Sequence, residues 1–195
     1  EIAFGDSGDA NIGRIAYNNN DNFLATVVNG AEAMRVHSNS VVSFDDGIAL
    51  GVGAANNTAA NVLDDYEEGT WTPAWSFSSG SVAYANQGGR YTKIGRTVTI
   101  NLYMNTSSIS SPSGNVGITG LPFTNDQETG CVIGILYRWN TDFDADLTFL
   151  VNESGSTISA YKQASTAEAA ALQGSDFLDG SGKNVVNLSA TYQTT

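Results

Sequence analysis

The abundance of carboxylates makes glycoside hydrolysis the first chemistry to consider. The chain carries 20 Asp and Glu residues but only 8 Lys and Arg. Cleavage of a glycosidic bond needs two carboxyl groups held roughly 5 to 9 Å apart across one sugar, and abundance alone predicts no such pair. The chain also lacks the length and the repeats of a large parallel β-helix whose groove could hold a sugar chain. We therefore predict that the protein is not an enzyme.

Two carboxylates are the best candidates for metal ligands. Residues 142–146 (DFDAD) alternate acidic and apolar side chains, and Glu153 stands where a twelve-residue calcium loop has its last ligand. The sixth position of that loop requires Gly but holds Leu147, and the following residues have a strand pattern, which excludes an EF-hand. Asp142 and Asp144 remain candidates for a looser calcium site, with a solvated turn as the alternative.

Five residues are the best candidates for contact with a ligand, because they leave an apolar run and enter a polar turn: Tyr137, Arg138, Trp139, Asn140 and Asp142. Aromatic rings stack on the apolar faces of sugar rings, while amide, carboxylate and guanidinium groups bond to the hydroxyls. Trp, Tyr and Arg are also enriched in contacts between protein chains. The segment therefore predicts a carbohydrate contact, with packing in the core or between subunits as the alternative.

Two potentially reactive side chains, a histidine and a cysteine, each occur once. His37 follows a short strand, and we expect a structural role for it at the surface or near an assembly axis. Cys131 begins an apolar run and has no cysteine partner within the chain. We expect it to be a small buried core residue, not a nucleophile.

The composition indicates a packed protein with a weakly charged surface. Apolar residues make up 41% of the chain and charged residues 14%, against roughly 25% charged residues in typical soluble domains. Asn, Ser, Thr and 21 Gly residues replace the missing charge. The net charge is −12 and the basic residues are scattered, so no basic stripe is available to bind phosphates. We therefore exclude nucleic acid as a partner.

The chain has no apolar stretch long enough to span a membrane and no segment of signal-peptide type. We therefore expect no membrane insertion. Because the sequence begins with Glu1 instead of Met, we expect it to be a fragment of a longer protein.

Alternation of apolar and polar residues predicts an all-β chain. Two strands have the clearest alternation, with apolar positions at Val98, Ile100, Leu102 and Met104 and at Val186, Leu188, Ala190 and Tyr192. Residues 131–136 (CVIGIL) are apolar on both faces, which predicts a central strand. One short helix is expected to begin at the capping box of Ser165 and Glu168 and to end at Gly174.

The distribution of apolar bulk divides the chain into three parts. We expect a shaft-like β-meander at 1–46, an acidic neck or linker at 47–71, and a β-sandwich of jelly-roll type at 72–195. The meander has too few large apolar residues to make a core of its own. Identical chains wrapped around one axis could supply the missing burial. The alternative is that the meander packs on the domain that follows it.

One stretch of the sequence is specific enough to suggest a family. Residues 63–73 (LDDYEEGTWTP) resemble a signature of many phage tail-fibre and tail-spike-like proteins. Three further stretches agree with that family in the same order, namely 89–95 (GRYTKIG), 118–123 (ITGLPF) and 190–194 (ATYQT). Upstream, 13–15 (GRI) and 33–36 (AMRV) resemble shaft-like repeats. The resemblance covers effectively the whole chain.

The resemblance implies a homotrimeric, receptor-binding tail fibre that attaches the virion to its host, with the sandwich at the tip. The implied partners are a host cell-surface polysaccharide or lipopolysaccharide and other tail proteins upstream. Such a protein is made in the host cytoplasm and works outside it, as part of the virion. The resemblance implies no catalytic residues. Two alternatives stay open: another virion fibre or capsid decoration protein, and a polysaccharide-degrading tail spike.

Overall fold

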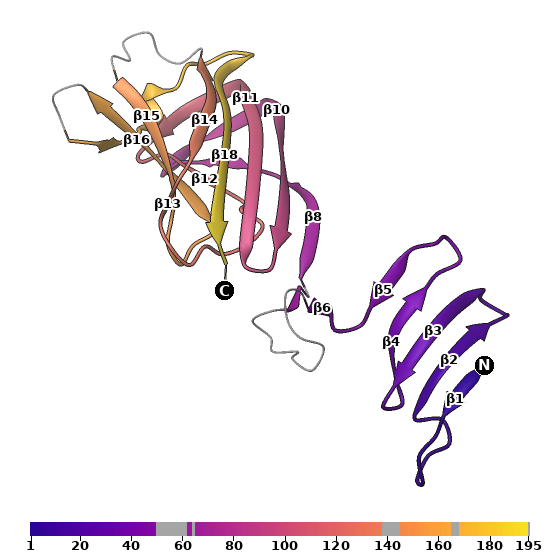
Figure 1. The fold of residues 1–195 in the computed structure, drawn as a ribbon. Coiled ribbons are helices and arrows are strands. Elements are labelled where there is room, and N and C mark those ends of the chain that lie inside the picture. Colours follow the sequence, from indigo (N-terminus) through magenta and orange to yellow (C-terminus); the bar gives the residue numbers. More distant parts are fainter. Residues whose placement is uncertain (50–61, 64, 138–144, 165–167, 195) are drawn as a thin grey trace. The chain divides into compact units, whose positions relative to one another are not determined.

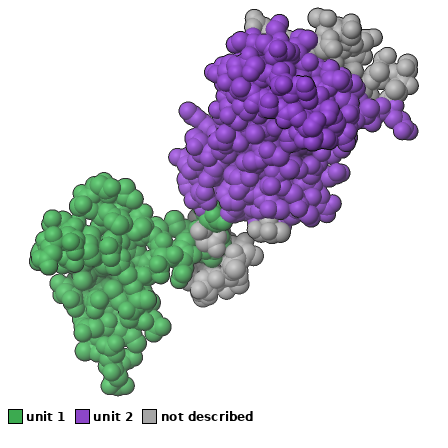
Figure 2. All heavy atoms as spheres, turned by 180° about the vertical axis from the view of Figure 1, so that it is seen from behind, with its two compact units in different colours: residues 1–65 green, residues 66–195 purple. Residues whose placement is uncertain are grey.

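The computed structural model describes residues 1–49, 62–63, 65–137, 145–164 and 168–194 (Figure 1). It confirms the predicted all-β class, since nearly every described element is a strand. The chain divides into two compact units, residues 1–65 and 66–195, coloured separately in Figure 2. Among the described residues, no helix has the length and apolar character needed to cross a membrane.

The first unit is built on one five-stranded antiparallel sheet whose strands follow chain order. They are β1 (Ile2–Phe4), β2 (Gly13–Asn18), β3 (Phe23–Val28), β4 (Ala31–Val36) and β5 (Val42–Phe44). The turn between β3 and β4 is Asn29-Gly30, with φ of 51° and 76°. Both residues are left-handed, which is the conformation of a two-residue hairpin turn. A short pair, β6 (Ile48–Ala49) and β7 (Val62–Leu63), completes the unit.

The two faces of this sheet differ sharply in what covers them. On one face Ala25 and Val27 are each 5% exposed. On the same face the Arg35 guanidinium lies 3.8 Å from the centre of the Phe23 ring and pairs with Glu32 at 2.5 Å. The stems of long polar side chains thus shield the small residues beneath them.

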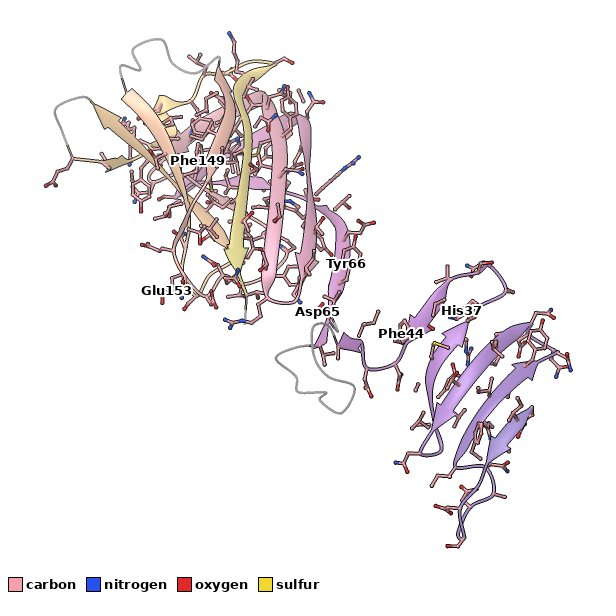
Figure 3. All side chains as sticks on the ribbon, in the orientation of Figure 1. His37, Phe44, Asp65, Tyr66, Phe149 and Glu153 are labelled. Carbon is pink, nitrogen blue, oxygen red and sulfur yellow. The ribbon has the colours of Figure 1, made fainter. Side chains whose placement is uncertain are left out.

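The opposite face, here called the apolar face, is formed by two rows of directly paired residues. The rows are Ile2, Ile15, Thr26, Met34 and Phe44, and Tyr17, Leu24, Val36 and Val42. Large side chains on this face stay open to solvent: Ile2 is 60% exposed, Tyr17 54% and Phe44 44%. No second layer of described strands in this unit covers them. Figure 3 marks Phe44 on this sheet.

The second unit is a β-sandwich. Its front sheet has the order β14 (Val132–Tyr137), β18 (Lys183–Gln193), β11 (Thr97–Ser113), β10 (Ser79–Ile94) and β8 (Tyr66–Trp71). Its back sheet has the order β13 (Thr129–Gly130), β15 (Ala145–Val151), β16 (Thr157–Ala164), β12 (Gly117–Thr119) and β9 (Ala74–Ser76). A short strand, β17 (Ala170–Ala171), pairs with β16. The sandwich is as predicted, while its jelly-roll type stays a prediction.

The core between the sheets follows the predicted alternation. Val98, Ile100, Leu102 and Met104 of β11 are at most 2% exposed, and Tyr192 of β18 is 1% exposed. Phe149 of β15, labelled in Figure 3, is fully buried opposite them. Because strands alternate faces, the intervening residues of β11 and β18 must point away from the core.

The predicted central strand at 131–136 is instead an edge strand. β14 ends the order of the front sheet, and β18 is its one partner among the described strands. Val132 on its outward face is 70% exposed, while Ile133 packs against the core. An apolar run on both faces suits a central strand, but long-range pairing placed this run where only one face is buried.

The predicted helix at 165–174 is also wrong in its described part. Ala170 and Ala171 pair with Lys162 and Tyr161 of β16, and only residues Gly174–Asp176 form a single 3-10 turn. Leu172 is fully buried and its N–H donates to the Ala160 carbonyl at 2.8 Å. A helix of about two turns gains little on its own, so sheet pairing and burial of Leu172 prevail.

The segment Tyr66–Trp71 forms part of the sandwich, although the sequence places it in the acidic linker. As β8 it pairs with β10 over its whole length. Its alternation explains why: Trp71 is 6% exposed, whereas Tyr66 at the other end is 61% exposed. The density of acidic residues indicated a solvated neck, but Glu67 and Glu68 both stay exposed on this edge strand.

Two glycines face two aromatic rings across the β8–β10 pair. The register places Gly69 opposite Tyr91 and Trp71 opposite Gly89. A Cβ on Gly69 would lie 2.8 Å from the Tyr91 hydroxyl, and a Cβ on Gly89 would overlap the Trp71 indole nitrogen. The indole N–H donates to the Asn101 carbonyl at 3.2 Å. Each ring therefore covers the glycine of the other strand, which fixes the register of the pair.

We expect Gly89→Ala to destabilise the second unit by about 1–3 kcal/mol, because the added methyl displaces the Trp71 ring from a packed core. Gly88→Ala is the matched control, since a Cβ there meets no atom within 4 Å. Urea unfolding followed by Trp fluorescence measures both variants. Equal stabilities of the two variants would show that the ring does not depend on the glycine.

The buried hydroxyl of Tyr192 predicts a loss of stability at high pH. Burial raises the pKa of Tyr192 from 10.0 to about 12, and the hydroxyl donates to the Phe123 carbonyl at 3.1 Å. Between these two values the unfolded chain loses the proton first, so unfolding becomes more favourable as pH rises. Tyr192→Phe should cost about 1 kcal/mol at pH 7, and its deficit relative to the natural chain should shrink from pH 10 to 12. Chemical denaturation across this range is the measurement, and a constant deficit would contradict the expectation.

Candidate binding site

Most of the residues predicted to touch a ligand lie outside the described residues. Tyr137 is the last residue of β14, whereas Arg138, Trp139, Asn140 and Asp142 are outside the described ranges, as is Asp144. Among the described residues, no group of three or more His, Cys, Asp or Glu could hold a metal ion. The carbohydrate contact and the calcium site at these positions therefore stay predictions.

The described residues present a different surface, the outward face of the front sheet, here called the polar face. Three neighbouring rows cross its strands: Glu68, Thr92, Thr99 and Thr191; Thr70, Arg90, Asn101 and Ser189; and Gly88, Tyr103 and Asn187. The row members are residues directly opposite one another, so their side chains leave the sheet on the same side. Paired strands hold them in place, which makes this surface more rigid than a loop.

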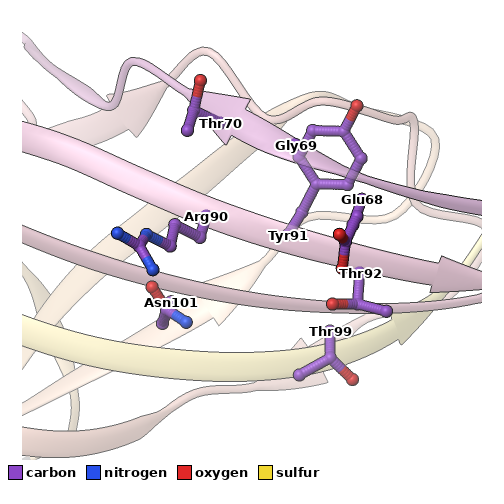
Figure 4. Close-up of a pocket in the computed structure, with 8 residues that line it drawn as sticks. All are labelled: Glu68, Gly69, Thr70, Arg90, Tyr91, Thr92, Thr99 and Asn101. Atoms are coloured by element: carbon purple, nitrogen blue, oxygen red, sulfur yellow. The ribbon is translucent and has the colours of Figure 1, made fainter.

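Two shallow hollows lie next to each other on the polar face and share Thr70, Arg90 and Asn101. The first, of about 430 Å³, extends from these residues to Glu68, Thr92 and Thr99. Figure 4 shows the side chains of Arg90 and Asn101 lying next to each other at one end of this hollow. Together the hollows cross the strands β8, β10 and β11.

The second hollow, of about 640 Å³, is walled by an aromatic ring. Tyr103 of β11 is 39% exposed, and its cross-strand neighbour on β10 is Gly88. Since Gly88 has no side chain, nothing from β10 covers the ring at this position. Asn187 of β18 lines the hollow on the other side of Tyr103. The volume lies in the range of about 300–1,000 Å³ found for small-molecule sites.

Several polar groups at the second hollow keep their bonding capacity. Within the described part of the chain, Arg90 makes no ion pair or hydrogen bond, and the side-chain amides of Asn101 and Asn187 make none either. In the neighbouring row the Thr99 and Thr191 hydroxyls bond to each other at 3.1 Å. The Arg90, Asn101 and Asn187 groups are therefore available to a ligand at the second hollow.

Carboxylates near the polar face are already bonded to phenols. The Tyr66 hydroxyl donates to Glu68 at 3.0 Å, and the Tyr91 hydroxyl donates to Glu67. Each hydrogen bond raises the pKa of its phenol, because ionising the phenol would place two negative charges side by side. Among the described residues, neither of these carboxylates forms an ion pair with Arg90.

Neither Cys131 nor His37 lines the two hollows of the polar face. Burial raises the pKa of Cys131 to about 12, so the thiol stays protonated at neutral pH and is a poor nucleophile. Cys131 packs against the core as predicted, but it is half-buried and not fully buried. His37 lies in the first unit, where its Nε2 is 2.9 Å from the Ser43 hydroxyl.

Sequence reasoning missed the polar face as a site. It identified the alternation of β11 and the stretch 89–95, but it used the polar members of each strand only to define which residues are buried. The available signal was Gly88-Gly89, a pair that leaves both faces of β10 without a side chain. The glycine pair can be interpreted only once Tyr103 is known to lie opposite Gly88 and Trp71 opposite Gly89.

Comparison with known proteins gives a likeness of fold. No protein-family model matches the sequence, and no curated protein is similar to it. A solved structure that resembles the chain is the Dettilon tailspike protein (gp208), with a TM-score of 0.54 and 19% sequence identity. The match covers 66% of this chain but only 23% of the tailspike chain. At this identity the likeness concerns the fold: much of the chain has an all-β arrangement that also occurs in a tailspike protein.

Proposed function

We propose that the chain is a segment of a bacteriophage tail fibre or tailspike that assembles as a homotrimer and attaches the virion to glycans of the host surface. The fold it shares with a tailspike protein supports the class of protein. So does the resemblance of residues 63–73 to the tail-fibre signature. The C-terminal sandwich is the tip in this proposal, and upstream tail proteins continue the fibre.

The observation that carries the proposal is the apolar face of the first unit. Its strands alternate correctly for a buried sheet, yet Ile2, Ile15 and Phe44 in one row are 60%, 41% and 44% exposed. Monomeric proteins rarely expose such a continuous apolar surface. Burying it stabilises the chain by about 25 cal/mol for every Å² removed from water.

A second copy of the chain is the partner that best fits this face. Symmetric self-association brings apolar faces of identical shape and chemistry together, and each copy leaves the same surface open. Three copies around one axis would enclose the apolar faces and leave the faces with Arg35 and Glu32 in solvent. This arrangement supplies the burial that the small first unit lacks.

Attachment through weak, repeated contacts suits this architecture. Three tips offer three equivalent sites, and simultaneous engagement raises the overall affinity well beyond that of one site. The segment that carries Arg138, Trp139 and Asn140 is the proposed receptor contact at each tip. We propose binding without cleavage of the glycan, so incubation with the host polysaccharide should release no shorter products.

The rival assignment is another fibre or a decoration protein of the capsid, which could use the same trimeric sandwich. Location on the particle separates the two. Gold-labelled antibodies against the sandwich should mark the tail of the virion in electron micrographs, and labelling of the capsid would instead establish the rival.

The trimer predicts a specific effect of charge on the apolar face. Ile15→Asp places a carboxylate where the subunits meet, and an unpaired buried charge costs several kcal/mol. Light scattering should therefore give three times the 20.4 kDa of one chain for the natural protein, and the mass of a single chain for the variant. Val132→Asp is the matched control, because Val132 is 70% exposed on the second unit. A natural protein that is a single folded chain at high concentration would end the proposal.

The attachment role predicts that Trp139→Ala weakens adsorption to host cells by about 30-fold, the effect of losing a contact of about 2 kcal/mol. Trp139→Tyr, which keeps an aromatic face, should retain most of the binding. Adsorption is measured with fluorescent protein, and light scattering checks that each variant stays trimeric. Dissociation of the Trp139→Ala trimer would instead assign the residue to subunit packing.

A further inference from the structure

We propose that the hollow beside Tyr103 on the polar face binds an acidic saccharide, with Arg90 pairing with a sugar carboxylate. This inference rests on the proposed function, which it deepens by naming a second binding surface and a ligand class. The site is built from Arg90 of β10, Asn101 and Tyr103 of β11, and Asn187 of β18.

The ring of Tyr103 provides the apolar platform. It is 39% exposed, and Gly88 opposite it leaves the neighbouring position empty. A Cβ at Gly88 would meet no atom within 4 Å, so the strand itself does not require glycine for close packing there. The C–H face of a pyranose ring can stack on an open aromatic ring of this kind.

Arg90 makes the proposed site selective for a negatively charged ligand. It is exposed, and among the described residues it has no carboxylate or carbonyl partner. The planar guanidinium matches a carboxylate with two parallel hydrogen bonds, which is a stronger and more directional contact than a single neutral bond. The nearby Glu68 carboxylate accepts from the Tyr66 hydroxyl and lies one row away on β8.

The two asparagines provide the remaining recognition. The Asn101 side chain lies beside Arg90 in the same row, and Asn187 lies beside Tyr103 in the next row. Each amide offers two donors and one acceptor that no described residue uses. Vicinal sugar hydroxyls are both donors and acceptors, so amides of this kind can satisfy them around a stacked ring.

Arg90 is a positive group on a strongly negative chain, and this contrast indicates the charge of the ligand. With a net charge of −12, the protein repels an anionic glycan at a distance. Retention of an anion must therefore come from contact, and the uncompensated guanidinium in the hollow is suited to provide it. A neutral glycan would leave this cation unused. A carboxylate-bearing sugar is consequently the ligand class that the surface favours.

The test uses the full chain and two probes with the same sugar backbone, charged trigalacturonate and its neutral methyl ester, with binding measured by saturation-transfer NMR titration. Trigalacturonate should bind at least ten-fold more tightly than the ester. Arg90→Gln should remove this preference, whereas Arg90→Lys should keep part of it. Arg14→Gln, which makes the same charge change in the first unit, should leave binding unchanged. Gly88→Val, which fills the space beside Tyr103, should abolish binding of both probes without lowering the melting temperature.

The inference is overturned if the natural chain binds neither probe, if the ester binds as tightly as the acid, or if Arg90→Gln binds like the natural protein. In each of these cases a trimer that still adsorbs to host cells leaves the proposed function intact. If the natural protein neither forms a trimer nor adsorbs to host cells, the proposed function itself is rejected.

Discussion

The reciprocal packing of Gly69 under Tyr91 and of Gly89 under Trp71 holds the edge of the front sheet in place. Each ring needs an empty position on the neighbouring strand, and the spacing of one intervening residue on both strands provides it in a single register. A slip of β8 by one residue would turn Trp71 out of the core. The pairing thus fixes β8, closes one end of the core, and sets Thr70 opposite Arg90 on the polar face.

The two units differ in how their apolar side chains are covered. The sandwich places two sheets face to face, and residues such as Ile100 and Phe149 lose all contact with water. The first unit is built on one five-stranded sheet, which can shelter one face only with its own side chains. Arg35 shelters Phe23 on one face, while the other face has no described cover within the unit. The self-association proposed above would bury this face, since identical sheets can cover what one sheet exposes.

A binding site on a sheet and a binding site on a loop differ in the conformational entropy that the protein loses on binding. Strands hold Arg90, Asn101 and Tyr103 at fixed spacing, so the proposed site would lose little conformational entropy on binding a ligand. The hollows are shallow, and a single site of this kind gives modest affinity. Multiple copies compensate for shallow contacts by raising the effective concentration of the ligand at the remaining sites. The proposed trimer and the proposed weak glycan contacts are therefore consistent with each other.

The sequence by itself determined the all-β class, the buried alternation from Val98 to Met104, and the shortage of bulk in the first 46 residues, because a period of two and side-chain size are local properties. Only the tertiary structure decided that 131–136 is an edge strand and that Tyr66–Trp71 belongs to the sandwich. It also brought Arg90, Tyr103 and Asn187 together from three strands. Alternation shows which residues share a face, but the partners of each strand are set by long-range pairing and by competition for burial, which no local pattern contains.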